Sequence, residues 1–394
     1  MGLRDPVVCI VGAGPAGLVT AHLLHQAGVP FVLLERQRAD QLRVRVKAGM
    51  IEHRTVELLQ RHGLAGPILG GGLRVGRCEF RTGGQAFLLD YAGLCGGRGH
   101  YIYPQHDLVA DWAGELLDRG GDVRFGVTAS GIEQSGDGAL VRAAAGPDGA
   151  PVTIECEAVA VCDGAGSGLG AAAAGFTAAY PTRWLALIAA VPPPPDGTIY
   201  GLHEQGFAGQ MHRSATLSRF MLEVPGGEDY RQWDDDRIWA ELTHRLTAAG
   251  RPPVQRGEFT EQDILDLRVR VCDPMQSGRL FLAGDAAHLI TPAGGKGMNI
   301  AIQDAAELAG GLIERYGRGD GGHRLDSYSQ TRLPRVWRYQ EFSNLMLSLF
   351  NAGAAADSSG FSYGLRRARL DLLLTDPQFS RWFAHTYVGV DEAP

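Results

Sequence analysis

A glycine-rich turn near the N-terminus constrains the fold of this chain more than any other feature. The apolar run 7–11 leads into a GxGxxG pattern, and the segment 15–27 that follows has helical periodicity; the glycines are Gly12, Gly14 and Gly17. A second apolar run, 31–34, ends at Glu35, about 20 residues beyond the glycines, where a carboxylate can accept ribose hydroxyls. This order predicts a β-α-β unit whose helix N-terminus binds the pyrophosphate of a dinucleotide. The pattern alone does not distinguish NAD from FAD.

The composition describes a globular chain with a large apolar core. The chain has 394 residues, of which 45% are hydrophobic and 21% charged. Its 44 acidic residues outnumber its 37 basic ones, so the chain lacks the overall positive field of a nucleic-acid-binding protein. The longest apolar run, 184–191, is shorter than the roughly 18 residues that cross a bilayer, and the N-terminus lacks the order of a signal peptide. We expect no nucleic-acid or membrane partner and a cytoplasmic location.

The cysteines and histidines form no metal-binding pattern. The six cysteines are scattered without a CxxC pair, and the sequence contains no HExxH motif. Several cysteines lie within apolar runs, which is typical of buried, reduced thiols. We therefore expect no metal site and an organic cofactor.

Two later apolar runs end in an acidic residue beside a glycine. The run 158–161 precedes Asp163-Gly164, and the run 280–283 is followed by Gly284-Asp285. The segment between them alternates apolar and polar residues, which is typical of strands, whereas the tail is rich in Ala, Leu and Arg at helical spacing. We predict an α/β fold with four parts: a Rossmann-like dinucleotide-binding domain (1–179 and 269–302), an inserted strand-rich substrate domain (180–268) and a helical C-terminal region (303–394).

The segment 278–299 decides which dinucleotide is bound. It reads GRLFLAGDAAH followed by PAGGKGMN, and it resembles the second FAD-binding motif of the flavoprotein aromatic hydroxylases, which are FAD-dependent monooxygenases. Cys162-Asp163-Gly164 is similar to the Asp-Gly motif of this family. Within the family the likeness is to the p-hydroxybenzoate hydroxylases; it extends over nearly the whole chain, through matches at 35–37, 45–49, 103–105, 213–219, 273–276, 335–337, 342–343 and 387–389. The resemblance implies that FAD is the cofactor and that NADH or NADPH is the cosubstrate.

The resemblance also assigns cofactor contacts. The implied FAD-binding residues are Gly12, Gly14, Gly17, Glu35, Arg36, Arg45, Gln105, Asp163, Arg219, Asp285, Gly297, Met298 and Asn299. Independently of the likeness, the glycines from Gly294 to Gly297 precede an apolar periodic segment, which predicts a helix N-terminus with exposed N–H groups. A flavin ring docked there would have its anionic reduced form stabilised by the helix dipole.

The residues implied to contact the nicotinamide cosubstrate match the family only in part. The matching residues are Arg36, Gln37, Arg45 and Arg268. The family's well-known NADPH-preferring members have Tyr, Arg, His and Arg where this chain has Gln41, Lys47, Gly166 and Gly170. Fewer fixed donors for a 2′-phosphate weaken the discrimination. We expect NADH to be accepted at least comparably with NADPH.

The resemblance implies roles for two tyrosines and a proline. The implied chemistry is hydride transfer from the nicotinamide to FAD, reaction with O₂, and transfer of one oxygen atom to an electron-rich aromatic ring. Tyr200 and Tyr387 stand where the family's two relay tyrosines help to deprotonate a phenol, and Pro292 stands where a carbonyl group faces the substrate oxygen. The family relay ends at a histidine, but the corresponding place, near Arg74 and Val75, holds none.

Arg213 is the candidate for binding a substrate carboxylate, because a guanidinium group offers a planar fork of donors that matches a benzoate. The family places a serine two residues before this arginine and a tyrosine eight residues after it, whereas this chain has Met211 and Met221 there. Thioethers are weak acceptors and do not donate. The pocket near the carboxylate is therefore predicted to be softer and more apolar.

These residues predict a monooxygenase that hydroxylates a 4-hydroxybenzoate-type aromatic acid ortho to its hydroxyl group, with O₂ and NADH or NADPH. An amino-substituted or otherwise substituted benzoate, or another phenol, is the alternative substrate. A flavin oxidase or dehydrogenase is a second enzymatic alternative, and a non-catalytic FAD-binding redox sensor is an alternative of a different class. The resemblance also implies a homodimer.

Overall fold

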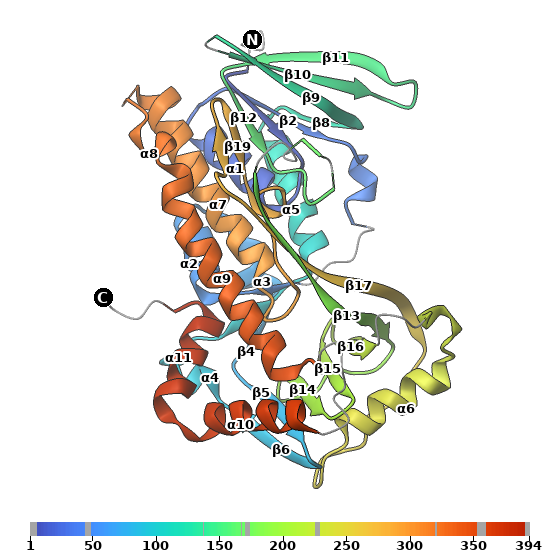
Figure 1. Ribbon diagram of the computed structural model, residues 1–394. Coiled ribbons are helices and arrows are strands. Elements are labelled where there is room, and N and C mark those ends of the chain that lie inside the picture. Colours follow the sequence, from blue (N-terminus) through green and yellow to red (C-terminus); the bar gives the residue numbers. More distant parts are fainter. Residues whose placement is uncertain are drawn as a thin grey trace.

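The computed structural model describes residues 6–43, 49–136, 138–166, 168–169, 174–224, 229–319, 321–352 and 360–390. These residues form an α/β fold with a parallel sheet at one end and a large, mostly antiparallel sheet at the other (Figure 1). Helices from the second half of the chain run along one side and wrap around the far end (Figure 1). The predicted fold class is confirmed.

The parallel sheet carries the predicted β-α-β unit. Its order is β18-β19-β12-β1-β2-β8, with the bounds β1 (Val8–Val11), β2 (Phe31–Glu35), β8 (Val123–Phe125), β12 (Ala158–Val161), β18 (Gln276–Ser277) and β19 (Leu280–Leu282). Every residue of β1, β2 and β12 is buried, as expected for continuous apolar strands covered on both faces. Helix α1 (Pro15–Gln26) packs against α5 (Gln105–Asp118) and α7 (Gly297–Leu312).

A second sheet of eight strands forms the other end of the molecule. Its order is β20-β17-β13-β16-β15-β14-β5-β6, with the bounds β5 (Cys78–Thr82), β6 (Gln85–Leu89), β13 (Gly175–Ala189), β14 (Thr198–His203), β15 (Gly206–His212), β16 (Ser218–Val224), β17 (Phe259–Cys272) and β20 (His288–Leu289). The long strands β13 and β17 run from the parallel sheet into this one (Figure 1). The predicted strand-rich segment 180–268 supplies its centre.

The sheet also recruits strands from outside that segment. β5 pairs in parallel with β14, from Thr198 opposite Cys78 to Leu202 opposite Thr82, and β6 follows β5 as a hairpin. The sequence interpretation had placed these two strands with the dinucleotide-binding domain. More than 100 residues of chain separate β5 from β14, and no local sequence pattern predicts that the two strands pair.

Apolar residues on the two faces of this sheet form two separate cores. Phe220 and Leu222 face α6 (Asp235–Leu246) and pack with its Trp239. The opposite face carries Tyr200 and Met221, which belong to a core shared with the C-terminal helices α9 (Tyr328–Phe350), α10 (Phe361–Thr375) and α11 (Pro377–Val388). The C-terminal helices therefore close the face of the sheet that carries the candidate substrate residues.

The remaining elements are shorter. They are η1 (Ala39–Gln41), β3 (Met50–Ile51), α2 (His53–Arg61), α3 (Gly66–Gly71), β4 (Leu73–Val75), α4 (Tyr91–Leu94), β7 (His100–Ile102), β9 (Val127–Ser135), β10 (Gly138–Ala145), β11 (Ala150–Cys156), η2 (Tyr230–Gln232), η3 (Gly284–Ala286), η4 (Ile313–Arg318) and α8 (His323–Asp326). Strands β9, β10 and β11 form an antiparallel sheet, and β3, β7 and β4 form another. Within the described ranges, no helix is both long and apolar enough to span a membrane, and no cluster of three His, Cys, Asp or Glu side chains could hold a metal ion.

Candidate active site

The glycine-rich turn between β1 and α1 has the shape of a phosphate-binding cradle. Gly12 has φ +104°, and a Cβ atom there would lie 2.6 Å from the carbonyl oxygen of Cys162. A Cβ atom at Gly17 would lie 1.9 Å from the carbonyl oxygen of Gly12, so both positions require glycine. A Cβ atom at Gly14 would meet only the Cys162 carbonyl, at 3.9 Å. The open space at Gly14 and the N-terminus of α1 therefore fit the phosphates of FAD.

Four strand ends meet at the edge of the parallel sheet beside this turn. β1, β2, β12 and β19 run parallel, so their carboxyl ends lie at one edge. The residues at or just beyond these ends are Gly12, Glu35, Asp163 and Asp285. The strand order reverses at β1, with β2 on one side and β12 on the other, and open α/β sheets bind their ligands at such a point.

Glu35 is fixed beside the turn by two backbone groups. The N–H of Ala13 donates to its Oε2 at 2.7 Å, and the N–H of Gln37 donates to its Oε1 at 2.9 Å. Each carboxylate oxygen keeps a further lone pair. The carboxylate is therefore oriented to accept ribose hydroxyls of the dinucleotide.

Asp285 lies on the η3 turn, which the chain holds from two sides. The N–H of Gly284 donates to Oδ2 of Asp304 at 3.1 Å. On the other side, Nη2 of Arg270 donates to the carbonyl oxygen of Asp285 at 2.9 Å and to that of the next residue at 2.9 Å. These bonds fix the backbone at Asp285, at the edge of the parallel sheet where the strand ends meet.

Asp304, which anchors this turn, is the centre of a buried cluster that the sequence analysis missed. Its Oδ2 lies 2.5 Å from Nε2 of His288, and its Oδ1 accepts from Nε of Arg332 at 2.7 Å. Burial alone would raise the pKa of Asp304, but His288 and Arg332 hold this pKa below its usual value. The carboxylate of Asp304 therefore stays ionised and continues to accept the hydrogen bond from the N–H of Gly284 in the turn.

The start of α7 is shaped by Asn299. Its Oδ1 accepts from the N–H of Glu52 at 2.8 Å, and its Nδ2 donates to two backbone carbonyl oxygens, at 2.9 and 3.0 Å. The side chain is thus engaged within the chain and braces the turn before the helix. No side chain among the described residues caps the first turn of α7, so its N–H groups, including those at Gly297 and Met298, would be available to a flavin docked there.

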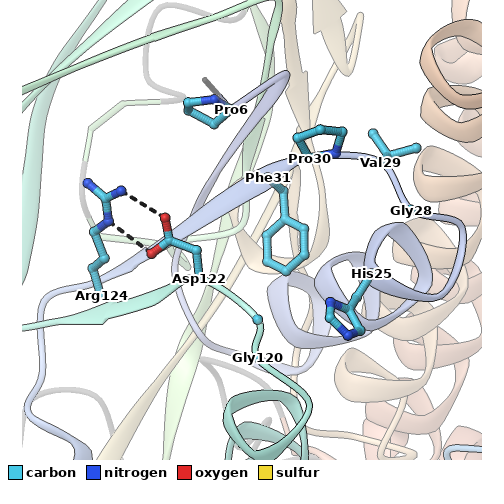
Figure 2. A pocket seen from close by; sticks show the side chains of 10 residues that line it. Pro6, His25, Gly28, Val29, Pro30, Phe31, Gly120, Asp122 and Arg124 are labelled. Atoms are coloured by element: carbon cyan, nitrogen blue, oxygen red, sulfur yellow. Dashed lines mark hydrogen bonds and ion pairs between the residues drawn. The ribbon is translucent and has the colours of Figure 1, made fainter. Parts of the chain in front are cut away.

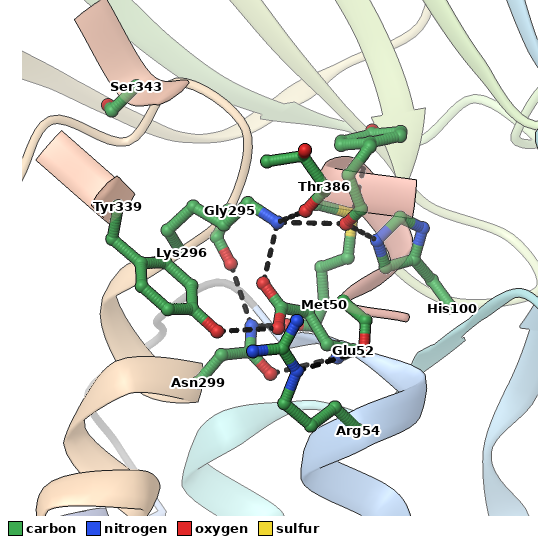
Figure 3. Close-up of polar contacts among 12 residues, drawn as sticks. Met50, Glu52, Arg54, His100, Gly295, Lys296, Asn299, Tyr339, Ser343 and Thr386 are labelled. Carbon is green, nitrogen blue, oxygen red and sulfur yellow. Dashed lines mark hydrogen bonds and ion pairs between the residues drawn. The ribbon is translucent and has the colours of Figure 1, made fainter. Parts of the chain in front are cut away.

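A buried lysine lies at this helix start, and the sequence analysis did not single it out. Nζ of Lys296 lies 2.6 Å from Oε1 of Glu52, and it also donates to the carbonyl oxygens of Thr386 and Tyr387, both at 2.8 Å (Figure 3). The other Glu52 oxygen accepts from the hydroxyl of Tyr339 at 2.8 Å. Burial lowers the pKa of Lys296, and Glu52 opposes that change. The cluster ties α7 to α2, α9 and α11.

The structure brings Tyr200 and Tyr387 together, although 187 residues separate them. Their hydroxyl oxygens lie 2.7 Å apart, and both side chains are buried. The Tyr200 ring contacts the rings of Phe80 and Phe350, which also contact each other, and the Tyr387 hydroxyl also contacts the sulfur of Met50 at 3.8 Å. Burial raises the pKa of both tyrosines above the usual range. Both tyrosines are therefore protonated and neutral at ordinary pH, and their hydroxyl groups interact through a hydrogen bond.

The candidate substrate residues share one face of the large sheet. Tyr200 on β14 pairs with Gly209 on β15, which pairs with Met221 on β16, so the three point to the same side. Met211 lies two residues beyond Gly209 on the same face. Arg213 follows directly after the end of β15 at His212, where its N–H donates to the carbonyl oxygen of Leu217 at 3.1 Å in the turn before β16.

The two candidate arginines lie close enough to affect each other. Arg219 pairs with Met211 across β15 and β16, and burial and Arg213 together lower its pKa. Burial also lowers the pKa of Arg213, with Glu261 and Asp107 opposing. The buried Nε of Arg219 has no hydrogen-bond partner among the described residues. Two arginines in one half-buried region fit an anionic substrate and an electron-rich cofactor edge.

Pro292 is exposed, and its carbonyl oxygen accepts from the N–H of Gly295 at 3.1 Å. Of the other predicted cofactor residues, Gln105 is the first residue of α5. Arg45 lies outside the described residues.

The residues predicted to contact the nicotinamide are spread over two sheets. Arg36 is exposed and Gln37 half-buried just beyond β2. Arg268 lies on β17 of the other sheet, where it forms an exposed ion pair with Asp266 at 2.8 Å.

The cavity in Figure 2 is not part of this site. It has a volume of about 380 Å³ and is lined by Phe31 at the start of β2 and by the Asp122–Arg124 ion pair beside β8. These strand starts lie at the edge of the parallel sheet opposite the glycine turn. A larger cavity of about 1070 Å³ lies on the α6 side, next to His203 and His244.

The fold and the converging strand ends define the class of protein: a flavoprotein with an FAD-binding domain. Residues 5–343 match the family described as "FAD binding domain". The chain is 34% identical over 388 residues to p-hydroxybenzoate hydroxylase of Acinetobacter baylyi, covering 97% of this chain and 95% of that protein. This chain belongs to the flavin-dependent aromatic hydroxylases, and FAD is its cofactor.

Other similar proteins carry names that refer to different substrates. The chain is 29% identical to anhydrotetracycline monooxygenase of Streptomyces rimosus, over 98% of this chain and 76% of that protein. The solved structure of OxyS anhydrotetracycline hydroxylase from the same species superimposes with a TM-score of 0.76 at 25% identity, covering 99% of this chain and 77% of that one. The p-nitrophenol 4-monooxygenase of Pseudomonas putida DLL-E4, at 22% identity and a TM-score of 0.80, covers 98% of this chain and 97% of that one and shares the fold.

Proposed function

We propose that this chain hydroxylates a 4-hydroxybenzoate-type aromatic acid ortho to its hydroxyl group, with O₂ and NADH or NADPH. The observation that carries the proposal is the buried Tyr200–Tyr387 hydroxyl pair, with Arg213 just beyond the end of β15, the strand that pairs with the β14 strand of Tyr200. A hydroxyl pair at one end and a guanidinium at the other match the two ends of a para-hydroxy acid. The identity with p-hydroxybenzoate hydroxylase of A. baylyi over nearly the whole chain supports this choice.

The residues of the chain bind, orient and shield the acid. FAD, when bound, accepts hydride from the nicotinamide and supplies the activated oxygen. Arg213 binds the carboxylate, and Tyr200 exchanges a hydrogen bond with the phenol, whose deprotonation makes the ortho carbon more electron-rich. Phe80 and Phe350 exclude water around Tyr200, which protects the oxygen-transfer step from side reactions.

The methionines modify this recognition. Met211 and Met221 replace two hydrogen-bonding groups near the carboxylate with thioethers, at a loss of about 0.5–1.5 kcal/mol for each neutral hydrogen bond. The ion pair between the substrate carboxylate and Arg213 is stronger than either of these neutral hydrogen bonds, and it is retained. A Cβ atom at Gly209 would lie 2.8 Å from Cζ of Phe207 and 3.1 Å from Cε of Met211, so the Phe207 ring and the flexible Met211 side chain share the space above this glycine. This favours an amino-substituted or otherwise substituted benzoate as the second candidate substrate.

The experiment is a panel of 4-hydroxy-, 4-amino-, 3-amino-4-hydroxy- and 3-hydroxybenzoates with uncharged phenols, scored for NAD(P)H consumption and for hydroxylated product. We expect a para-substituted acid to give the most product and Arg213→Ala to raise its KM about 100-fold. The carboxylate assignment is wrong if uncharged phenols outperform every acid. A lack of response to every aromatic compound would favour the redox sensor.

We further propose that NADH is accepted at least as well as NADPH. Gln41 and Gly166 leave fewer fixed donors for a 2′-phosphate than NADPH-preferring relatives have. Steady-state kinetics with both nucleotides test this, and strict NADPH dependence would refute it.

We propose that two copies of the chain associate through α10. This helix exposes Phe361, Leu365 and Leu372, whose spacings of four and seven residues place them on one side. Light scattering is expected to give a dimer for the wild type and a monomer for Leu365→Glu/Leu372→Glu. A wild-type monomer would contradict this proposal.

A further inference from the structure

A buried histidine lies against the hydroxyl pair and has no part in the function proposed above. His100 on β7 is fully buried, and its ring lies 4.5 Å from the Tyr387 ring and 5.3 Å from the Tyr91 ring. Tyr91 comes from α4, and its ring contacts the Tyr387 ring at 5.3 Å. The side chains of His100, Tyr91 and Tyr387 therefore form one aromatic cluster, which includes one member of the hydroxyl pair.

The hydrogen bonds of His100 fix its tautomer. Nε2 lies 2.8 Å from the carbonyl oxygen of Tyr387, which can only accept, so Nε2 carries the proton (Figure 3). Nδ1 lies 3.3 Å from the hydroxyl of Tyr91 and therefore accepts from it. The imidazole thus joins α4 to α11 by one donated and one accepted bond.

His100 is neutral at ordinary pH and does not receive the substrate proton. The groups facing it are Lys296 at the start of α7, Tyr91 on α4 and Tyr387 on α11, with Glu52 behind the lysine. Burial and the Lys296 ammonium group lower the pKa of His100 to about 3. A histidine with this pKa acts through geometry rather than by accepting charge.

The geometry it controls is that of Tyr387. The carbonyl oxygen of Tyr387 accepts from both His100 and Lys296, each at 2.8 Å, so two donors fix the backbone at this residue. The rings of Phe342 and Phe383 contact the Tyr387 ring at centroid distances of 6.1 and 5.6 Å. The backbone anchor and the packed ring together hold the Tyr387 hydroxyl 2.7 Å from that of Tyr200.

We infer that His100, supported by Tyr91, is a positioning residue that holds Tyr387 against Tyr200 and thereby favours ionisation of the bound phenol. This inference deepens the proposed function and rests on it. Without the imidazole, the Tyr387 carbonyl loses a donor and the Tyr91 hydroxyl loses its acceptor, so both rings gain freedom. Misplacement of about 1 Å in such a pair lowers rates by up to about a hundredfold.

The test compares His100→Leu with His100→Gln, both loaded with FAD. Leucine fills space without hydrogen bonds, whereas glutamine can donate to the Tyr387 carbonyl and accept from Tyr91. The matched control is His22→Gln in α1, since His22 is also buried and also lies 2.8 Å from a backbone carbonyl oxygen, that of Trp112.

The first readout is the pH at which bound 4-hydroxybenzoate ionises, followed by its ultraviolet spectrum. We expect His100→Leu to raise this midpoint by about one pH unit and His100→Gln to restore most of it. Turnover of 4-hydroxybenzoate should fall about tenfold more than turnover of 4-aminobenzoate, because an aromatic amine donates electrons without losing a proton. An unchanged midpoint in FAD-loaded His100→Leu overturns the inference.

The second readout needs no substrate. In a crystal structure of His100→Leu, we expect the hydroxyl oxygens of Tyr200 and Tyr387 to lie more than about 3.5 Å apart. An unchanged separation overturns the inference. If the wild type neither binds nor hydroxylates any phenolic acid, the proposed function fails, and this separation alone decides whether His100 positions Tyr387.

Discussion

Lys296 and Glu52, which are 244 residues apart in the sequence, form an ion pair of 2.6 Å in which each side chain is 1% exposed. The ammonium group is also bonded to two backbone carbonyl oxygens of α11, and the carboxylate is bonded to Tyr339 of α9. A buried pair of this kind is costly to break, because one unpaired charge then remains in the interior. The pair therefore connects the start of α7 to the C-terminal helices α9 and α11.

Glu52→Gln is expected to lower the free energy of unfolding by about 3–5 kcal/mol, because it leaves the Lys296 ammonium group buried without its partner. The double variant Lys296→Met/Glu52→Gln removes both charges and should lose less. Urea unfolding followed by tryptophan fluorescence measures both. The control is Arg142→Gln, which breaks an exposed pair with Glu133 and should leave the free energy of unfolding nearly unchanged. Equal losses in the single and double variants would contradict the account.

Gly14→Val is expected to abolish flavin binding while the chain still folds. The new side chain points into the open space that the phosphates need, and Gly14 has φ −76°, which valine adopts without strain. Flavin absorbance per chain after purification is the measurement. Gly114→Ala in α5, where an added Cβ meets nothing within 4 Å, should keep its flavin. Full flavin content in Gly14→Val would rule out the assigned cradle.

The cofactor half of the site could be predicted because its signals are local. The strand before Gly12, the glycine spacing and Glu35 at the end of the next strand lie within 30 residues, and each has a direct backbone cause. The Gly284-Asp285 pair was likewise visible at the end of an apolar run. The structure places both at the same edge of the parallel sheet.

The substrate half could not be derived from local patterns. The roles of Tyr200 and Tyr387 could be predicted only from the family resemblance, because neither segment contains a pattern that predicts a contact with a residue 187 positions away. No histidine occurs near Val75 in the sequence, but the structure shows His100 directly opposite Val75 on the neighbouring strand. Antiparallel pairing brought a histidine to that face from a different strand, which sequence position alone does not reveal. Lys296 had a weak signal, as the single charge within a glycine-rich apolar segment.

Stability should depend on His100 between pH 6.5 and about 3. The folded pKa of about 3 lies below the usual 6.5, so in this window the unfolded chain binds a proton that the folded chain does not. Stability is therefore present above pH 6.5 and falls with decreasing pH, by up to about 1.4 kcal/mol per pH unit from this group. His100→Gln removes this contribution and should flatten the curve of unfolding free energy against pH. Parallel curves for wild type and variant would contradict the buried, neutral histidine.

The most direct test of the central claim is mass spectrometry of the product formed under ¹⁸O₂ with NADH and the best acid of the panel. We predict that the product carries one ¹⁸O atom on the ring carbon next to the hydroxyl or amino group, with the carboxylate retained. Tyr200→Phe should lower the yield from the phenolic acid by about 100-fold without loss of flavin. Oxidation of NADH that yields only hydrogen peroxide, with no ¹⁸O in any aromatic acid, would contradict the assignment as an aromatic acid hydroxylase.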